Sequence, residues 1–233
     1  MYVAEAVVEV VGAAARSVIL HGSLASGGFV AGRSDIDLLV VIDGAPADPS
    51  ALEHLVRHAE LGDAAGVDLH VVTADVAASP GPAPTVELYV GRHDGSSVGF
   101  EVERRVAAPD LLAELSMARA HGRALWGAAP AEVIGPVPAE WIVDRGRYWL
   151  TTWLTLTGDT EHATFMAHTA CRIWRFAVEN VHCSKTEAAA WALEREPAVR
   201  PALEHDERAL AALLTRVLNE TSPGRNRGSS AQI

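Results

Sequence analysis

Two aspartates one residue apart stand at the start of an apolar run in the segment "SDIDLLVVI", residues 34–42. In a β-strand, side chains two positions apart point to the same face of the sheet, so Asp35 and Asp37 would lie side by side. Two ionised carboxylates repel each other unless a cation joins them. Mg²⁺ is often held by one or two carboxylates together with substrate phosphates. The pair therefore predicts a Mg²⁺ site that takes part in phosphate chemistry.

A glycine-rich loop precedes the two aspartates. Gly22 and Ser23 follow the apolar run "SVIL", and three more glycines come before residue 33. Small residues let backbone N–H groups approach a phosphate closely, and Ser23 adds a hydroxyl donor. The segment lacks the Gly-Lys-Ser/Thr ending of a P-loop. We expect Gly22 and Ser23 to contact phosphate in a site of another type.

A third carboxylate should come from a neighbouring strand. Asp68 in "GVDLHVVT" begins a predicted strand, as the first two aspartates do, and the starts of adjacent strands meet at one edge of a sheet. Asp68 could act as a general base towards an attacking hydroxyl, or share the metal. Glu87 is the next candidate, followed by Glu101 and Glu103. The alternative interpretation of Asp68 is a turn residue at the start of a strand.

The overall charge of the chain argues against nucleic acid as a partner. The sequence has 233 residues and a formal net charge of −11 at pH 7. A basic face that could neutralise nucleic-acid phosphates is therefore not expected. An acidic surface suits a cationic small molecule, although acidity also favours solubility on its own account.

The sequence also bears on the compartment. It contains no continuous apolar run of the roughly 18 residues that a membrane span requires. The apolar N-terminus carries Glu5 and Glu9 and no basic region before them, which favours an amphipathic helix over a signal peptide. Cys171 and Cys183 are the two cysteines, and they lack CxxC spacing. We expect reduced thiols and a cytoplasmic protein.

Hydrophobic periodicity predicts an α+β chain with two domains. Strands are expected at 17–23, 35–43, 67–73, 85–91 and 98–106, the last at a sheet edge, with helices at 2–15, 51–61 and 109–127. A proline- and glycine-rich stretch follows at 127–138, and helices are then expected at 138–157, 160–182, 185–195 and 198–218. We predict a first domain over 1–130, a helical domain over 131–220 and a tail over 221–233.

The segment "GSLASGGFVAGRSDIDLLV" resembles the signature of the DNA polymerase β-like nucleotidyltransferases. More narrowly, residues of about 15 to 215 resemble the aminoglycoside adenylyltransferases that modify streptomycin and spectinomycin. In the C-terminal part, "ACRIW" (170–174) and "SKTEAAAWALEREP" (184–197) are similar to the family's "ARIW" and "PKDVAANWALERLP". The resemblance implies a nucleotidyltransferase domain, with a mixed sheet flanked by helices, followed by an all-helical bundle.

The resemblance also implies roles for several residues. Arg172 and Lys185 match the family's Arg and Lys that reach the phosphates of the nucleotide across the interdomain cleft. Arg can hold phosphate oxygens bidentately, and Lys acts as a point charge. Asp68 falls where the family has its catalytic Glu, and its side chain is one methylene shorter. ATP is the implied co-substrate.

The antibiotic side departs from the family pattern. His93 stands where the family has the Trp of "ELQFGEW", and His162 aligns with an acidic residue that holds the cationic drug. Asp159, Glu161 and Asp144 are the nearby acids that could supply the missing charge. The resemblance implies a hydroxyl-bearing small molecule as acceptor without fixing which one.

The predicted function is transfer of AMP from Mg²⁺-bound ATP to a hydroxyl of an aminoglycoside or aminocyclitol, by a monomeric antibiotic-resistance enzyme. One alternative keeps the chemistry and changes the acceptor to a protein or a non-antibiotic metabolite. Another is a sensor that binds ATP with Mg²⁺ and never releases pyrophosphate. The intact pair of Asp35 and Asp37 favours an enzyme over a sensor.

Overall fold

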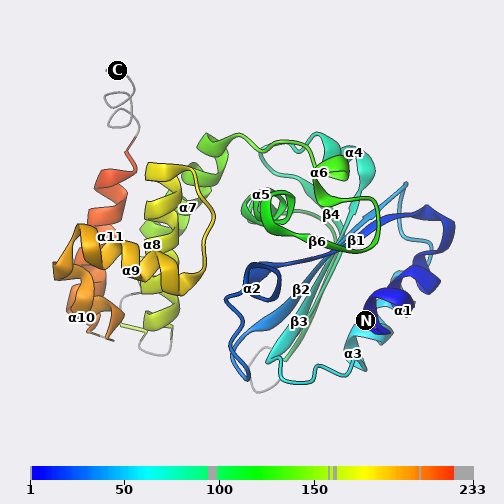
Figure 1. The fold of residues 1–233 in the computed structure, drawn as a ribbon, viewed down its shortest axis with the longest axis horizontal. Helices are drawn as coiled ribbons and strands as arrows, with labels where there is room; N and C mark the ends of the chain where they lie inside the picture. Colours follow the sequence, from blue (N-terminus) through cyan, green and yellow to red (C-terminus); the bar gives the residue numbers. More distant parts are fainter. Residues whose placement is uncertain (1, 94–98, 157, 160–161, 205, 223–233) are drawn as a thin grey trace. The chain divides into compact units, whose positions relative to one another are not determined.

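The computed structural model describes residues 2–93, 99–156, 158–159, 162–204 and 206–222. The chain forms two compact units, Met1–Val137 and Pro138–Ile233. The first combines a six-stranded sheet with helices, and the described part of the second is built from helices (Figure 1). The α+β prediction is confirmed.

The first unit is organised by a mixed sheet with the strand order β5-β4-β3-β2-β1-β6. Strands β2 and β3 pair in parallel, and every other neighbouring pair is antiparallel. The expected edge position of the strand near 98–106 is confirmed by β5. The strands are β1 (Ala15–His21), β2 (Asp35–Ile42), β3 (Gly66–Thr73), β4 (Thr85–His93), β5 (Phe100–Ala107) and β6 (Arg123–Gly127).

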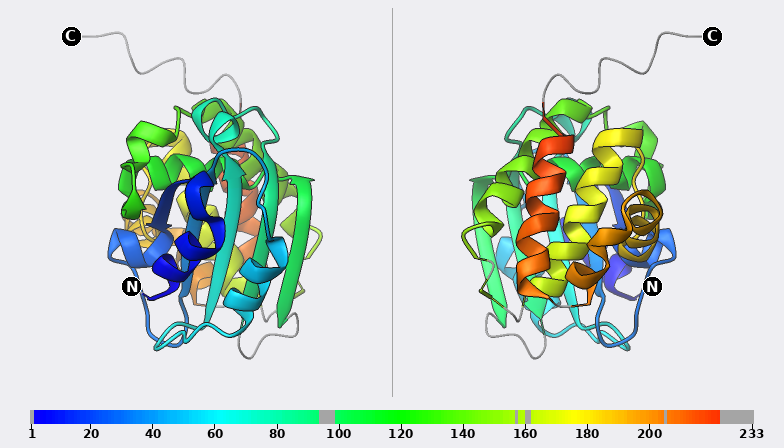
Figure 2. Two further views of the ribbon diagram at one scale, coloured as in Figure 1. Left: turned by 90° about the vertical axis from the view of Figure 1, so that its right-hand side faces the viewer. Right: turned by 90° about the vertical axis from the view of Figure 1, so that its left-hand side faces the viewer.

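One face of this sheet is covered by α1 (Tyr2–Val11) and α3 (Pro49–Arg57), which lie in front of it in the left view of Figure 2. The chain enters α3 through Asp48, whose carboxylate accepts a hydrogen bond from the backbone N–H of Ala51, with Pro49 in the first turn. The apolar side chains between sheet and helices alternate along the strands and include Val18, Leu20, Leu38, Val40, Leu69 and Val71.

The other face is apolar at one end and polar at the other. Its apolar end is covered by α4 (Ala74–Ala78), α5 (Leu111–His121) and α6 (Pro130–Val133), and the buried strand residues there include Ile19, Leu39, Val41 and Val72. By the two-residue period of a strand, further side chains point to the same face. At the opposite end of the strands these are His21, Asp35, Asp37, Asp68 and His70. The polar end is where a site can form.

The expected helix over 109–127 is wrong in its last turn and a half. Helix α5 ends at His121, and the "RALWG" segment forms β6, which pairs antiparallel with β1. Gly122 makes the change possible, since a Cβ there would overlap the carbonyl oxygen of Ala118 and the side chain of Ile19. Without β6, the outer edge of β1 would present unpaired backbone groups.

Three further short helical pieces were not expected. They are α2 (Gly22–Ser26) in the predicted glycine loop, α4 directly after β3, and α6 in the stretch before the second unit. A 3₁₀ turn at Gly12–Ala14 also separates α1 from β1. Each is five residues or shorter, so none has a hydrophobic period long enough to be read from sequence.

The second unit packs around a core that includes Trp174, Cys171, Met166, Leu150 and Leu214. Its helices are α7 (Ala139–Trp153), α8 (Ala163–Glu179), α9 (Lys185–Arg195), α10 (Arg200–Leu203) and α11 (Glu207–Glu220), with a 3₁₀ turn at Pro197–Val199. The expected helix over 198–218 is interrupted, because Asp206 caps a new helix through the backbone N–H groups of Arg208 and Ala209.

Both cysteines are free, Cys171 in the core and Cys183 half-buried. Among the described helices, none combines the length and the apolar character that crossing a membrane requires.

The centre of β2 supplies the first prediction. Leu39 is 1% exposed in the apolar half of the face that also bears the polar site. Leu39→Ala should lower the free energy of unfolding by about 2–5 kcal/mol, measured by urea denaturation, because it leaves a cavity. Leu125→Ala, on the exposed strand β6, is the matched control and should cost about 1 kcal/mol or less. Equal losses in the two variants would contradict the assigned core.

Candidate functional site

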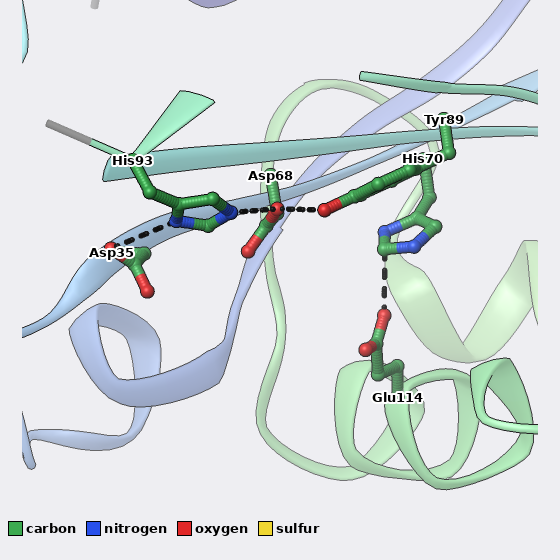
Figure 3. A network of polar contacts seen from close by, with 6 residues as sticks. All are labelled: Asp35, Asp68, His70, Tyr89, His93 and Glu114. Carbon is green, nitrogen blue, oxygen red and sulfur yellow. Dashed lines mark hydrogen bonds and ion pairs between the residues drawn. The ribbon is translucent and has the colours of Figure 1, made fainter. Parts of the chain in front are cut away.

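The strand register brings the predicted carboxylates together. The parallel pairing of β2 with β3 sets Asp37 beside Asp68 and Asp35 beside Gly66. The antiparallel pairing of β3 with β4 sets His93 across from Gly66. Asp35, Asp68 and His93 therefore meet although they come from three different strands (Figure 3).

His93 lies between two of the aspartates. Its Nδ1 is 3.7 Å from Oδ1 of Asp35, and its Nε2 is 3.4 Å from Oδ1 of Asp68. The hydrogen bond to Asp68, together with the charges of both aspartates, outweighs the effect of burial and raises the pKa of His93 to about 9. The imidazole is therefore a cation at neutral pH, and it offsets part of the negative charge that the aspartates concentrate.

Asp68 is held in its ionised form. Burial by itself raises its pKa, but the hydrogen bonds from His93 and Tyr89 act in the opposite direction, and the net pKa lies below the ordinary value. The Tyr89 hydroxyl donates to Oδ1 of Asp68 at 2.7 Å. Tyr89 and His93 thus both act as donors to Asp68, as expected for a carboxylate kept ionised in a half-buried place.

Tyr89 belongs to a polar chain that sequence reasoning missed. Its ring stacks on His70, with ring centroids 4.8 Å apart. Nδ1 of His70 is in turn 3.3 Å from Oε2 of Glu114 on α5 (Figure 3). Burial lowers the pKa of His70. The period-two spacing of Asp68 and His70 on one strand was the available signal, but the participation of Tyr89 and Glu114 depends on register and helix packing.

Asp37 sits in the most crowded position. Gly22 has φ +65°, and a Cβ at that residue would overlap the Asp37 carboxylate. The backbone N–H of Ser23 donates a hydrogen bond to the same carboxylate. Burial, followed by the charges of Glu114, Asp68 and Asp35, raises the pKa of Asp37 to about 7. The Gly-Ser pair thus provides space and a donor for Asp37.

His21 lies next to this group on β1, in register with Asp37. It is 2% exposed, and neither ring nitrogen has a hydrogen-bond partner within the part of the chain that the structure describes. Burial, and then the neighbouring His70, lower its pKa to about 3. His21 is therefore a neutral imidazole beside Asp37.

A divalent metal ion fits the residues at this edge. Among the described residues, the His, Cys, Asp and Glu ligand atoms that lie within 4.8 Å of one another belong to Asp35, Asp68 and His93. Two carboxylates and an imidazole are a donor set that divalent ions use. Asp37 is outside this group, as are Glu87, Glu101 and Glu103, the other carboxylates considered from sequence.

The remaining predicted residues belong to the second unit. Arg172 is half-buried on α8. Lys185 begins α9 after the Ser184 cap, and its Nζ lies 4.9 Å from the ring centroid of Phe165. His162 precedes α8, with its Nδ1 2.8 Å from Oδ2 of Asp159, so these two predicted acceptor contacts form one pair.

Two acids proposed as drug contacts complete the predicted set. Asp144 is exposed on α7. Glu161 lies outside the described residues.

Comparison with known proteins defines the class. Residues 2–85 match the family described as a nucleotidyltransferase domain, which covers the glycine turn and all three aspartates. Residues 132–220 match the family described as the aminoglycoside adenylyltransferase C-terminal domain. The first unit is a nucleotidyltransferase domain, as its sheet and carboxylates indicate.

The relatives are more specific. Proteins named aminoglycoside (3'') (9) adenylyltransferase from Klebsiella pneumoniae and Shigella flexneri are 29% identical over 208 residues, which cover 78% of this chain and 72% of each relative. The crystal structure of spectinomycin adenyltransferase AAD(9) from Enterococcus faecialis with ATP and spectinomycin has the same fold, with a TM-score of 0.68, 14% identity, and 94% of this chain and 98% of that chain covered. The chain is thus similar to the aminoglycoside adenylyltransferases in both of its units.

The raised pKa of Asp37 predicts how stability depends on pH. Because this pKa is about 7 when the chain is folded, the protonated carboxyl contributes stability that is fully present below about pH 4 and is lost as pH rises through 7. Asp37→Asn should therefore be close to wild type in melting temperature at pH 4 and more stable than wild type at pH 8.5, with EDTA present in both. A difference that is the same at both pH values would contradict the buried, crowded position of Asp37.

The bond from Tyr89 predicts a change at its neighbour. Tyr89→Phe should raise the pKa of Asp68, because the ionised carboxylate loses a donor, and should lower the free energy of unfolding by about 1–2 kcal/mol. A ¹³C NMR titration of the aspartate carboxyl groups measures the pKa. Tyr148→Phe, at an exposed tyrosine on α7, is the matched control. An unchanged titration of Asp68 in Tyr89→Phe would show that the bond is absent in solution.

Proposed function

We propose that the chain transfers AMP from ATP to a hydroxyl of an aminoglycoside or aminocyclitol. The observation that supports this most directly is the meeting of Asp35, Asp37 and Asp68 on two paired strands, beside the Gly22-Ser23 turn. The relatives named above are adenylyltransferases, and the AAD(9) structure holds ATP and spectinomycin. The proposal assigns to this chain the activity that the names of these relatives state.

Asp68 is proposed as the general base. Its two contacts in the described part of the chain, from Tyr89 and His93, fall on Oδ1, so Oδ2 is the oxygen available to an acceptor hydroxyl. The lowered pKa of Asp68 keeps it ionised and able to take a proton. In the reaction the hydroxyl proton passes to Oδ2, the hydroxyl oxygen bonds to the α-phosphorus, and the bond to the leaving pyrophosphate breaks with its electron pair.

Mg²⁺ with ATP is the proposed metal, and Asp35, Asp37 and Asp68 are its proposed ligands. When bound, such an ion would supply charge neutralisation for the phosphates. The protein's own contribution is to hold the carboxylates in place: Tyr89 orients Asp68, and the Ser23 N–H orients Asp37. Fixed orientation of this kind avoids the cost of reorganisation during the reaction.

Phosphate contacts are proposed for Gly22, Ser23, Arg172 and Lys185. The first two border Asp37, so a phosphate held there would lie beside the carboxylates. For Arg172 and Lys185 the support is the family match over residues 132–220 and the charge that a triphosphate requires.

The acceptor is proposed to be cationic. The net charge of −11 favours such a molecule. The pair of His162 and Asp159 offers a carboxylate at the position from which the resemblance implies a drug contact. We propose that the enzyme acts as a monomer in the cytoplasm.

The test is pyrophosphate release from ATP with Mg²⁺ across a panel of aminoglycosides and aminocyclitols that includes streptomycin and spectinomycin. Release with at least one compound is expected, with a loss of at least about 100-fold in Asp35→Asn, since it removes a charge that the reaction needs. Asp63→Asn, at an exposed aspartate, is the control and should keep full activity.

Silence across the whole panel, with ATP still bound, would contradict the antibiotic acceptor. A protein or metabolite acceptor, or a nucleotide sensor, would then replace it. Release that persists in Asp35→Asn would contradict the role of the carboxylates.

A further inference from the structure

We propose that His93 is a nitrogen ligand of the metal centre, beside Asp35 and Asp68, and that the centre therefore prefers a first-row transition ion such as Mn²⁺ to Mg²⁺. This inference rests on the proposed function, because it concerns the same metal, and it replaces the all-oxygen ligand set with a mixed one. The observations come from the spacing of the donor atoms, from two glycines, and from Tyr89.

The donor atoms are spaced for a shared ion. Nε2 of His93 lies 3.4 Å from Oδ1 of Asp68, and the ligand atoms of Asp35, Asp68 and His93 all lie within 4.8 Å of one another. Bonds of about 2.1 Å to a common ion place neighbouring ligand atoms roughly 3.0–3.5 Å apart. The His93 Nε2 and Asp68 Oδ1 atoms already have this spacing. Asp35 lies against the other ring nitrogen, Nδ1, at 3.7 Å, so its carboxylate has to turn towards Nε2 to share the ion.

Two glycines keep the space around these side chains open. A Cβ at Gly66 would lie 2.6 Å from Oδ1 of Asp35 and 2.7 Å from Nδ1 of His93. A Cβ at Gly91 would lie 3.1 Å from Oδ1 of Asp68 and would overlap the Tyr89 hydroxyl. The absence of a side chain at each glycine thus leaves room for two neighbouring polar side chains to approach each other. This room is set by the backbone and does not depend on the charges of the side chains.

Tyr89 supplies the outer contact that metal-binding carboxylates commonly have. Its hydroxyl donates to Asp68 at 2.7 Å and its ring is stacked on His70, so the direction of the Asp68 carboxylate is fixed from the side away from His93 (Figure 3). Outer hydrogen bonds of this kind orient ligands and add to metal affinity.

The ligand types decide which ion is preferred. Mg²⁺ favours oxygen ligands and an undistorted octahedron, and imidazole suits Zn, Cu, Fe and Ni best. Mn²⁺ shares the carboxylate preference of Mg²⁺ but, as a transition ion, accepts a nitrogen ligand more readily. Two carboxylates balance the charge of a divalent ion, and the coordinating ring nitrogen gives its proton to solvent when the ion binds. A centre with Asp35, Asp68 and His93 should thus bind Mn²⁺ more tightly than Mg²⁺.

The experiment measures Mn²⁺ bound to the full-length chain without nucleotide, by pulsed EPR. Coordination by His93 gives a ¹⁴N coupling from a directly bound imidazole in the wild type, and the coupling should disappear in His93→Gln. His54→Gln is the matched control, since His54 is on α3, which covers the other face of the sheet, and it should keep the coupling.

A titration gives a second readout that does not depend on turnover. In His93→Gln the Kd for Mn²⁺ should rise by at least about tenfold, which is the loss expected when a metal site is perturbed, while the Kd for Mg²⁺ changes little. Thermal unfolding of each variant confirms that it is folded.

Absence of the ¹⁴N coupling in the wild type overturns the inference, whatever the variants do. Its persistence in His93→Gln, or an unchanged preference for Mn²⁺, overturns it as well. Because no acceptor is present, these results are separate from the proposed function: pyrophosphate release with Mg²⁺ and no nitrogen coupling would leave AMP transfer standing with an all-oxygen site.

Discussion

Repulsion among three aspartates on two neighbouring strands is the constraint to which the rest of the site responds. Asp37 responds by holding its proton up to a pKa of about 7. Asp35 and Asp68 share the cationic ring of His93 instead. At the same edge, the repulsion is thus reduced in two ways, by protonation of one carboxylate and by a cation between the other two. A metal ion that binds at this edge can therefore replace the proton on Asp37, or take over the role of the His93 cation beside Asp35 and Asp68.

The sheet register makes this crowding possible. Its site-bearing face is divided along the strands, so that Leu39, Val41 and Val72 anchor α4, α5 and α6, while the other end of the same strands stays polar. A shift of one residue in either strand would turn the aspartates to the opposite face, under α1 and α3. The apolar half therefore fixes the position of the polar half.

Local patterns in the sequence were sufficient for the strands and for the shared direction of Asp35 and Asp37, because both follow from a period of two. The grouping of Asp68 with them followed from strand starts meeting at one edge. His93 was named from the family resemblance as an acceptor contact, and its place between two aspartates depends on β4 register, which no local pattern contains.

The remaining misses have the same origin. Tyr89 lies 21 residues from Asp68, and Glu114 reaches His70 from a helix that follows two further strands. Strand β6 was missed because "RALWG" continues a helical pattern, and only the unpaired edge of β1 gives it another partner. Interactions between distant segments, rather than local propensity, decided these positions.

Strand β6 also affects how the chain comes to be folded during its synthesis. It pairs with β1, and the hydroxyl of Ser17 on β1 donates to the carbonyl of Ala128, 111 residues later. As the ribosome proceeds from the N-terminus, β1 emerges long before its outer neighbour exists. An unpaired, apolar strand edge is a point at which nascent chains associate with one another. The outer edge of β1 is therefore protected from aggregation only when the first unit is almost completely translated.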